Sequence, residues 1–176
     1  MRRRHLAALL AVFAGAACGR PVVKPSLYEV RGAWVDDHEL AYPLESLRGS
    51  FAVISMAYGA CRRVCSTSLR LLEQLQALAD ERRVPLQFIV VGLDSSQDRP
   101  ADWAAYRTER KLQRTNWKFL TGSDASIAQL AHWLGVRYWH YGEHVMHDFR
   151  LVLVSPEGQL LAAMTTPDDG LMTLLP

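Results

Sequence analysis

The sequence predicts a single α/β domain with a mixed sheet, and three observations lead to that prediction. A buried-strand pattern over residues 51–58 passes directly into a helical pattern that begins at Thr67. Strand and helix patterns then alternate as far as Leu134, which implies crossover connections and parallel pairing. Two more strand patterns flank the turn at residues 155–158 and predict a terminal antiparallel hairpin. With 176 residues, 49% of them hydrophobic, the chain is long enough for one domain with a full core.

The elements follow in the order hairpin, strand, helix, strand, helix, strand, helix and hairpin. Short alternating segments predict the N-terminal β-hairpin within residues 27–40. Apolar residues at helical spacing predict the helices, which are expected at 67–80, 101–112 and 125–134. β-Branched and aromatic runs predict the remaining strands, at 51–58, 86–93, 117–120, 149–154 and 159–164. Residues 138–148 read as an aromatic and histidine-rich loop. A thioredoxin-like fold, with a central mixed sheet flanked by helices, accounts for this order best.

The first 18 residues read as an export signal. Three arginines precede an apolar run of 12 residues at 6–17, which is short of the roughly 20 that span a bilayer comfortably. Residues 15–18 are similar to a bacterial lipoprotein box, in which Cys18 would become the lipidated first residue. Ordinary cleavage near residues 14–16 and an uncleaved N-terminal anchor are the other interpretations. Residues 19–26 then form a tether, and residues 27–176 form the folded domain.

The charge of the chain argues against a nucleic-acid partner. The formal net charge is +2, but Arg2, Arg3 and Arg4 supply three positive charges at the N-terminus. The rest of the chain therefore carries −1, which gives no support for a basic nucleic-acid-binding surface.

Cys61 and Cys65 lie where a central strand turns into a helix. The partial positive charge of a helix N-terminus, together with Arg62 and Arg63, favours the thiolate form of these side chains. Positions four apart share a helix face, so the two sulfurs could form a disulfide or hold one soft metal ion. A structural disulfide and two buried, unreactive thiols are the plainer alternatives.

A metal held by the two sulfurs would need a further ligand, and the histidine-rich segment offers four. These candidates are His140, His144, Met146 and His147. His147 stands out because it comes just before a strand that returns toward the centre of the sheet. A lone histidine in a loop is more often simply solvated.

Several motifs in this order resemble the Sco/SenC family of copper-binding proteins. Residues 61–65 (CRRVC) match the CxxxC motif of that family, and residues 90–100 (VVGLDSSQDRP) match its "VSVDPxxDTP" stretch. Residues 118–122 (KFLTG) stand for its "GLTG" element. His147 lies nine residues before Pro156, which is the family's spacing for its copper-binding histidine. The chain departs from the family at the prolines that usually follow each cysteine, since Arg62 and Ser66 stand there.

The resemblance implies a copper chaperone with a thioredoxin-like fold. Copper, as Cu(I) or Cu(II), would be bound by Cys61, Cys65 and His147, with Asp94 and Asp98 as groups that orient the site or cap their loop. The implied partners are the copper-site subunit of a respiratory cytochrome c oxidase, other copper chaperones and thiol reductases. The implied location is the outer, periplasmic face of a bacterial inner membrane, through a lipid on Cys18 or an N-terminal anchor.

Three alternatives stay open at this stage. A thiol–disulfide oxidoreductase would use Cys61 and Cys65 as a redox-active disulfide without metal, and the arginines and missing prolines favour it. Zinc could replace copper, with water as a fourth ligand. A copper or redox sensor would need a signalling partner domain, which this chain does not contain.

Overall fold

The structure is a computed structural model, and it describes residues 25–59 and 64–176. A six-stranded mixed sheet in the order β1-β4-β3-β2-β7-β8 forms its centre. The strands are β1 (Trp34–Asp36), β2 (Ala52–Ala57), β3 (Gln87–Gly92), β4 (Trp117–Gly122), β7 (Leu151–Val154) and β8 (Leu160–Met164). Strands β2, β3 and β4 are parallel, whereas β1, β7 and β8 pair antiparallel with their neighbours. The predicted α/β class and mixed sheet are confirmed.

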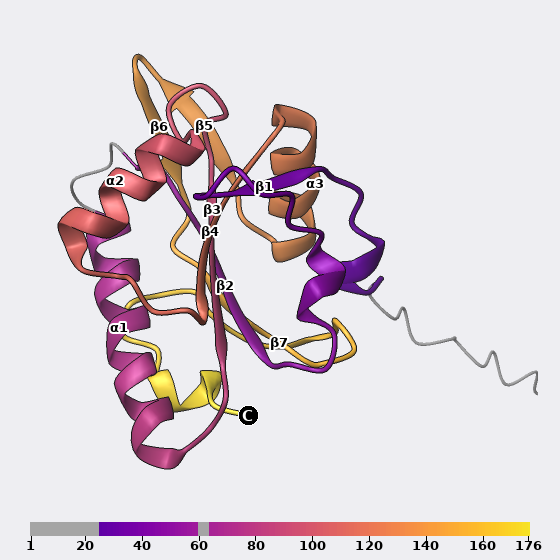
Figure 1. Cartoon of the computed structure of the whole chain (residues 1–176), viewed down its shortest axis with the longest axis vertical. Coiled ribbons are helices and arrows are strands. Elements are labelled where there is room, and N and C mark those ends of the chain that lie inside the picture. The colour runs from indigo at the N-terminus through magenta and orange to yellow at the C-terminus, as the bar shows by residue number, and fades with distance from the viewer. Residues whose placement is uncertain (1–24, 60–63) are drawn as a thin grey trace, which may run out of the picture.

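The helices cover both faces of this sheet. The chain steps outward from β2 to β4 through α1 (Val64–Arg82) and α2 (Pro100–Arg110), and it returns to the other side of β2 through α3 (Asp124–Leu134). The two crossovers between parallel strands, β2 to β3 and β3 to β4, step in the same direction, so right-handed connections place α1 and α2 on the same face. Accordingly, α1 and α2 lie on one side of the sheet and α3 on the other (Figure 1).

Local sequence explains where these helices begin and end. The Ser123 hydroxyl accepts a hydrogen bond from the Ser126 backbone N–H and caps α3. Gly135, in the left-handed conformation, ends the same helix. Pro100 opens α2, where its missing N–H leaves no helical hydrogen bond unmade.

The core lies on both sides of the central strands. Every residue of β2 and β7 is buried, as expected for strands covered on both faces. Aromatic rings extend the core under α2: Trp103, Trp117 and Phe119 are at most 2% exposed, and Trp117 stacks on Phe88 with ring centroids 4.9 Å apart.

Two elements differ from the sequence-based expectation. The N-terminal hairpin is reduced to β1 and a single antiparallel bridge between Val35 and Ala41, because Asp36 closes a tight turn by accepting the N–H groups of His38 and Leu40. The predicted loop at 138–148 is instead a β-hairpin of β5 (Tyr138–Tyr141) and β6 (His144–His147). This hairpin is a separate two-stranded sheet at one end of the molecule (Figure 1).

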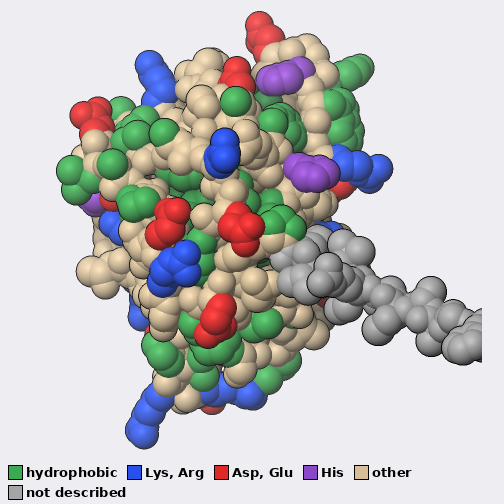
Figure 2. All heavy atoms as spheres, turned by 90° about the vertical axis from the view of Figure 1, so that its right-hand side faces the viewer, with side chains coloured by type: hydrophobic (Ala, Val, Ile, Leu, Met, Phe, Trp, Pro, Cys, Tyr) green, Lys and Arg blue, Asp and Glu red, His purple; other side chains and the backbone are tan. Residues whose placement is uncertain are grey.

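In the view of Figure 2, no large area of the surface carries charged side chains of only one sign. Basic and acidic side chains are interspersed there with hydrophobic ones, in keeping with the near-neutral charge of the chain. In the described residues, no helix combines the length and the hydropathy needed to cross a bilayer.

Candidate functional site

The candidate site lies at the carboxyl end of β2, where the sheet changes from parallel to antiparallel pairing. β2 pairs parallel with β3 on one side and antiparallel with β7 on the other. Ligands of open α/β sheets bind outside the carboxyl ends of the strands, at such a point. Tyr58 and Gly59 follow β2 at this end, two residues before Cys61.

The structure describes the three predicted copper ligands to different extents. Cys61 lies outside the described residues. Cys65 belongs to the first turn of α1, and its side chain is outside the description. His147 is a described, half-buried residue at the end of β6. The predicted three-ligand site therefore stays a prediction; among the residues that are described, no group of three or more His, Cys, Asp or Glu side chains could hold a metal ion.

His147 has the hydrogen-bond arrangement that is common among metal-binding histidines. Its Nδ1 lies 2.9 Å from the Asp148 carbonyl oxygen, and because a carbonyl can only accept, Nδ1 carries the proton and Nε2 the lone pair. Burial lowers the pKa of His147, while Asp148 acts in the opposite direction. The imidazole thus has one nitrogen oriented by a backbone acceptor, as in many metal-binding histidines.

Asp98 ties the ends of β2 and β3 together. Its Oδ1 accepts the Gly59 N–H at 2.7 Å, and its Oδ2 accepts the N–H groups of Leu93 and Asp94 at 2.9 and 3.0 Å. The residue is 1% exposed, and burial raises its pKa to about 6 against the opposing effect of the three N–H donors. This carboxylate fixes the backbone that leads into the cysteine segment.

The two nearest glycines are required by the position of Asp98. A Cβ atom on Gly92 would lie 2.5 Å from the Asp98 Cβ, and one on Gly59 would lie 2.9 Å from Asp98 Oδ1. Any side chain at these positions would push the carboxylate away from its three donors. The close approach explains why both strand ends carry glycine.

Asp94 organises its own loop. Its Oδ1 accepts hydrogen bonds from the Ser96 N–H, the Ser96 hydroxyl and the Gln97 N–H. Burial works to raise the pKa of Asp94, but these hydrogen bonds and the nearby His140 together lower it below its usual value. Asp94 is thus a loop cap, which was one of the two roles expected from the sequence.

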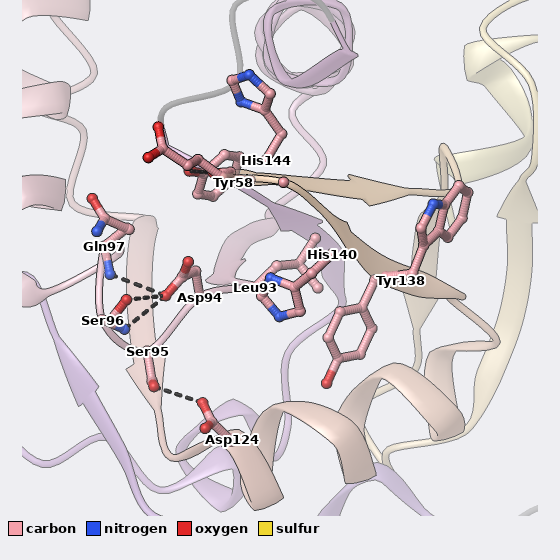
Figure 3. Close-up of a pocket in the computed structure, with 13 residues that line it drawn as sticks. Tyr58, Leu93, Asp94, Ser95, Ser96, Gln97, Asp124, Tyr138, His140 and His144 are labelled. Carbon is pink, nitrogen blue, oxygen red and sulfur yellow. Dashed lines mark hydrogen bonds between the residues drawn. The ribbon is translucent and has the colours of Figure 1, made fainter.

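An open pocket of about 1170 Å³ lies between this loop and the β5–β6 hairpin. Asp94, Asp124, Tyr138 and His140 line it (Figure 3), and the Ser95 hydroxyl bonds Asp124 at 2.6 Å. This pocket was not predicted from the sequence, because residues 138–148 were expected to form a loop and not a hairpin. Gly142, in a two-residue turn with φ of +60°, was the available hairpin signal.

Tyr58 connects the hairpin to the strand that leads to the cysteines. The side chain is 4% exposed, and its hydroxyl donates to the Glu143 carbonyl oxygen at 3.2 Å in the hairpin turn. At the base of the hairpin, the Arg137 guanidinium bonds the Asp148 carboxylate at 2.8 Å and holds the pKa of Asp148 below its usual value. These two contacts position β6, and with it His147, against the end of the sheet.

Known proteins share both the sequence pattern and the fold. A protein of Stutzerimonas stutzeri named "Putative copper-binding protein" is 29% identical over 153 residues, which cover 81% of this chain and 72% of that protein. Arabidopsis thaliana ScoI, solved with copper bound, is 19% identical with a TM-score of 0.71, over 81% of this chain and 89% of the other. BsSco, a member of the Sco family of cytochrome c oxidase assembly proteins with an identified disulfide switch, is 24% identical with a TM-score of 0.68, over 84% and 92%.

The family comparison covers most of the described domain. The family model described as SCO1/SenC matches residues 33–171, from the start of β1 to the last 3₁₀ turn. This range includes the CxxxC segment, Asp94, Asp98 and His147, which together carry the sequence resemblance. The chain therefore belongs to the SCO1/SenC family.

Proposed function

We propose that the protein is a copper chaperone that binds one copper ion through Cys61, Cys65 and His147. The observation that carries this proposal is the placement of His147, a half-buried imidazole whose Nδ1 lies 2.9 Å from the Asp148 carbonyl oxygen, within a family that includes copper-bound members. Two thiolates and one imidazole form a soft donor set that suits Cu(I), and the same set accepts Cu(II). Asp98 acts on this site through Gly59, by fixing the backbone two residues before Cys61.

The proposed role is the assembly of the copper centre of a respiratory cytochrome c oxidase. Support comes from the relationship to BsSco, which belongs to a family of cytochrome c oxidase assembly proteins. Copper would be bound when both cysteines are reduced, so the redox state of the pair controls loading. Other copper chaperones or thiol reductases would then supply copper or keep the cysteines reduced.

A copper-transfer assay tests the proposed role in oxidase assembly. The copper-loaded full chain would be mixed with the copper-free copper-site domain of an oxidase subunit, and copper on each protein would be measured after separation. Transfer that requires His147 in the donor is expected. If no copper moved, and reduced copper-free chaperone instead converted an oxidised target to its dithiol while Cys61 and Cys65 became the disulfide, the role would be thiol reduction.

A metal-independent thiol–disulfide oxidoreductase is the second candidate. The disulfide switch identified in BsSco and the arginines between the two cysteines favour it. In that reaction one thiolate attacks a substrate disulfide, and the second cysteine releases the reduced substrate while Cys61 and Cys65 become the oxidised pair. Turnover by copper-free protein that is unchanged in His147→Ala would support this candidate over the chaperone.

We also propose attachment to the outer face of a bacterial inner membrane through a lipid on Cys18. The support is the sequence of the first 18 residues, in which an apolar run ends in small residues and a cysteine. Mass spectrometry of the purified chain should find a diacylglycerol modification on Cys18, and Cys18→Ser should release the protein from membranes. A mature N-terminus near residue 16 without lipid would show ordinary cleavage instead.

A further inference from the structure

The β5–β6 hairpin has two chemically different faces. Side chains alternate along each strand, and the register pairs Trp139 with Met146 and Tyr141 with His144. These four side chains therefore share one face, and Tyr138, His140, Val145 and His147 share the other. Figure 3 shows this division: His144 lies on the opposite side of the hairpin from His140 and Tyr138, although it also borders the rim of the pocket near the hairpin turn.

The face that carries His144 is open to solvent. Trp139, Tyr141 and Met146 are 50%, 74% and 43% exposed, whereas Val145 on the other face is 4% exposed. Half of the six exposed large hydrophobic side chains in the described part of the chain lie on this small surface. Apolar side chains gathered in this way usually serve binding.

The donor atoms of this face select soft cations. His144 and Met146 are two positions apart on the same side of β6, so their Cα atoms are about 7 Å apart and the side chains are neighbours. At this separation the His144 imidazole nitrogen and the Met146 thioether sulfur can reach one ion from neighbouring positions on the same face. Thioether ligands favour Cu(I) over zinc, and the aromatic rings of Trp139 and Tyr141 add a cation–π attraction.

We propose that His144 and Met146 form an accessory Cu(I) site on the outer face of the hairpin, with Trp139 and Tyr141 beside the ion. This inference rests on the proposed copper function and adds a route of entry to it. Met146 immediately precedes His147, so copper held on the outer face is one residue from the proposed ligand on the inner face. The accessory site is weaker than the three-ligand site because it supplies two protein ligands, and copper bound there passes on to Cys61, Cys65 and His147.

The test uses Ag(I), which has the ligand preferences of Cu(I) but no redox chemistry at the site. The full chain with Cys18, Cys61 and Cys65 all replaced by serine would be labelled with ¹³C in the methionine methyl groups and titrated with Ag(I), followed by NMR. Met172 is the matched control, because it is 47% exposed, close to the 43% of Met146, but lies in a different element. Wild-type protein with alkylated thiols serves as a second sample if the serine variant does not fold.

We expect Ag(I) to shift the Met146 methyl signal at concentrations that leave Met172 unchanged. Loss of an outer-shell partner already costs metal sites 10–100-fold in affinity, so His144→Ala should weaken binding at least about tenfold. Met172→Leu should have no effect. Equal shifts at Met146 and Met172, or unchanged binding in His144→Ala, would show nonspecific binding to surface methionines and overturn the inference.

The failure of this inference is distinguishable from failure of the proposed function. In wild-type protein, Met146→Leu should slow the loading of Cu(I) without changing the final affinity, whereas His147→Ala should lower the final affinity. Tight copper with no Ag(I) response at Met146 would overturn the accessory site alone. An Ag(I) response at Met146 without tight copper in the wild type would overturn the proposed function.

Discussion

Replacing Asp98 with asparagine tests whether a buried carboxylate fixes the backbone before the cysteine segment. The wild-type carboxylate has a pKa of about 6 in the folded protein, against a usual value of 3.8, because burial disfavours its charge. The folded state therefore binds a proton more tightly than the unfolded state between about pH 4 and pH 6. The contribution of Asp98 to stability is largest at low pH and is lost as the pH rises through 6.

The structure gives the size of this effect. A pKa difference of about two units corresponds to about 3 kcal/mol, most of which is expressed between pH 7 and pH 4. The free energy of unfolding of wild type minus that of Asp98→Asn should therefore rise by about 2–3 kcal/mol over this range. Urea unfolding at pH 7, 6, 5 and 4 measures it. A difference that stays constant or shrinks toward pH 4 would refute the reasoning.

Asp169→Asn is the matched control for this experiment. The Asp169 carboxylate also accepts backbone N–H groups, from Thr165 and Thr166, but it is exposed and those hydrogen bonds lower its pKa. Its stabilising effect is present above its usual pKa and is lost only as the pH falls through the lowered value. The difference in free energy of unfolding between wild type and Asp169→Asn should therefore stay constant between pH 4 and pH 6.

The same Asp98 variant has a second readout at the proposed copper site. The asparagine oxygen can keep the two donors at the end of β3, but its amide group then faces the Gly59 N–H. Loss of such a supporting contact lowers metal affinity by about 10–100-fold. Cu(I) competition at pH 7 checks this, and an unchanged affinity would restrict Asp98 to a role in stability.

Two further variants test the packing around the site. Gly92→Ala should destabilise the protein by about 1–3 kcal/mol in urea unfolding, because its Cβ would overlap Asp98, whereas Gly170→Ala, with no neighbour within 4 Å, should change stability by less than about 0.5 kcal/mol. Equal effects would contradict the close approach. Tyr58→Phe removes the hydrogen bond to Glu143 and should cost about 1 kcal/mol, with faster amide hydrogen exchange in the β5–β6 hairpin. Unchanged exchange there would mean that Tyr58 does not anchor the hairpin.

The sequence was sufficient for most of the sheet and helices because their patterns are strong. β2 and β3 are continuous apolar runs, and the caps of α3 are a serine and a glycine in their usual places. The N-terminal hairpin was over-predicted because alternation in residues 27–40 does not reveal that β1 takes its main partner, β4, from far along the chain. The β5–β6 hairpin was missed because aromatic and histidine side chains obscured its alternation.

The site was less predictable because it depends on contacts between distant segments. Asp94 and Asp98 were expected to orient the site or to cap their loop, but their spacing gave no reason to separate these roles. The structure separates them: Asp94 caps its own loop, and Asp98 reaches across to Gly59, 39 residues away. The link from Tyr58 to Glu143 spans 85 residues and has no local sequence signal.

Anaerobic titration of the reduced full-length protein with Cu(I), against a competing chelator, tests the proposed copper site most directly. Wild type, His147→Ala and Cys61→Ala would be compared, with Cys18→Ser as the control outside the site. The proposal predicts one tightly bound copper in wild type and Cys18→Ser, and weaker binding in both site variants. No tight copper in wild type, or an affinity unchanged in His147→Ala, would contradict the three-ligand site and favour a thiol–disulfide enzyme on the same fold.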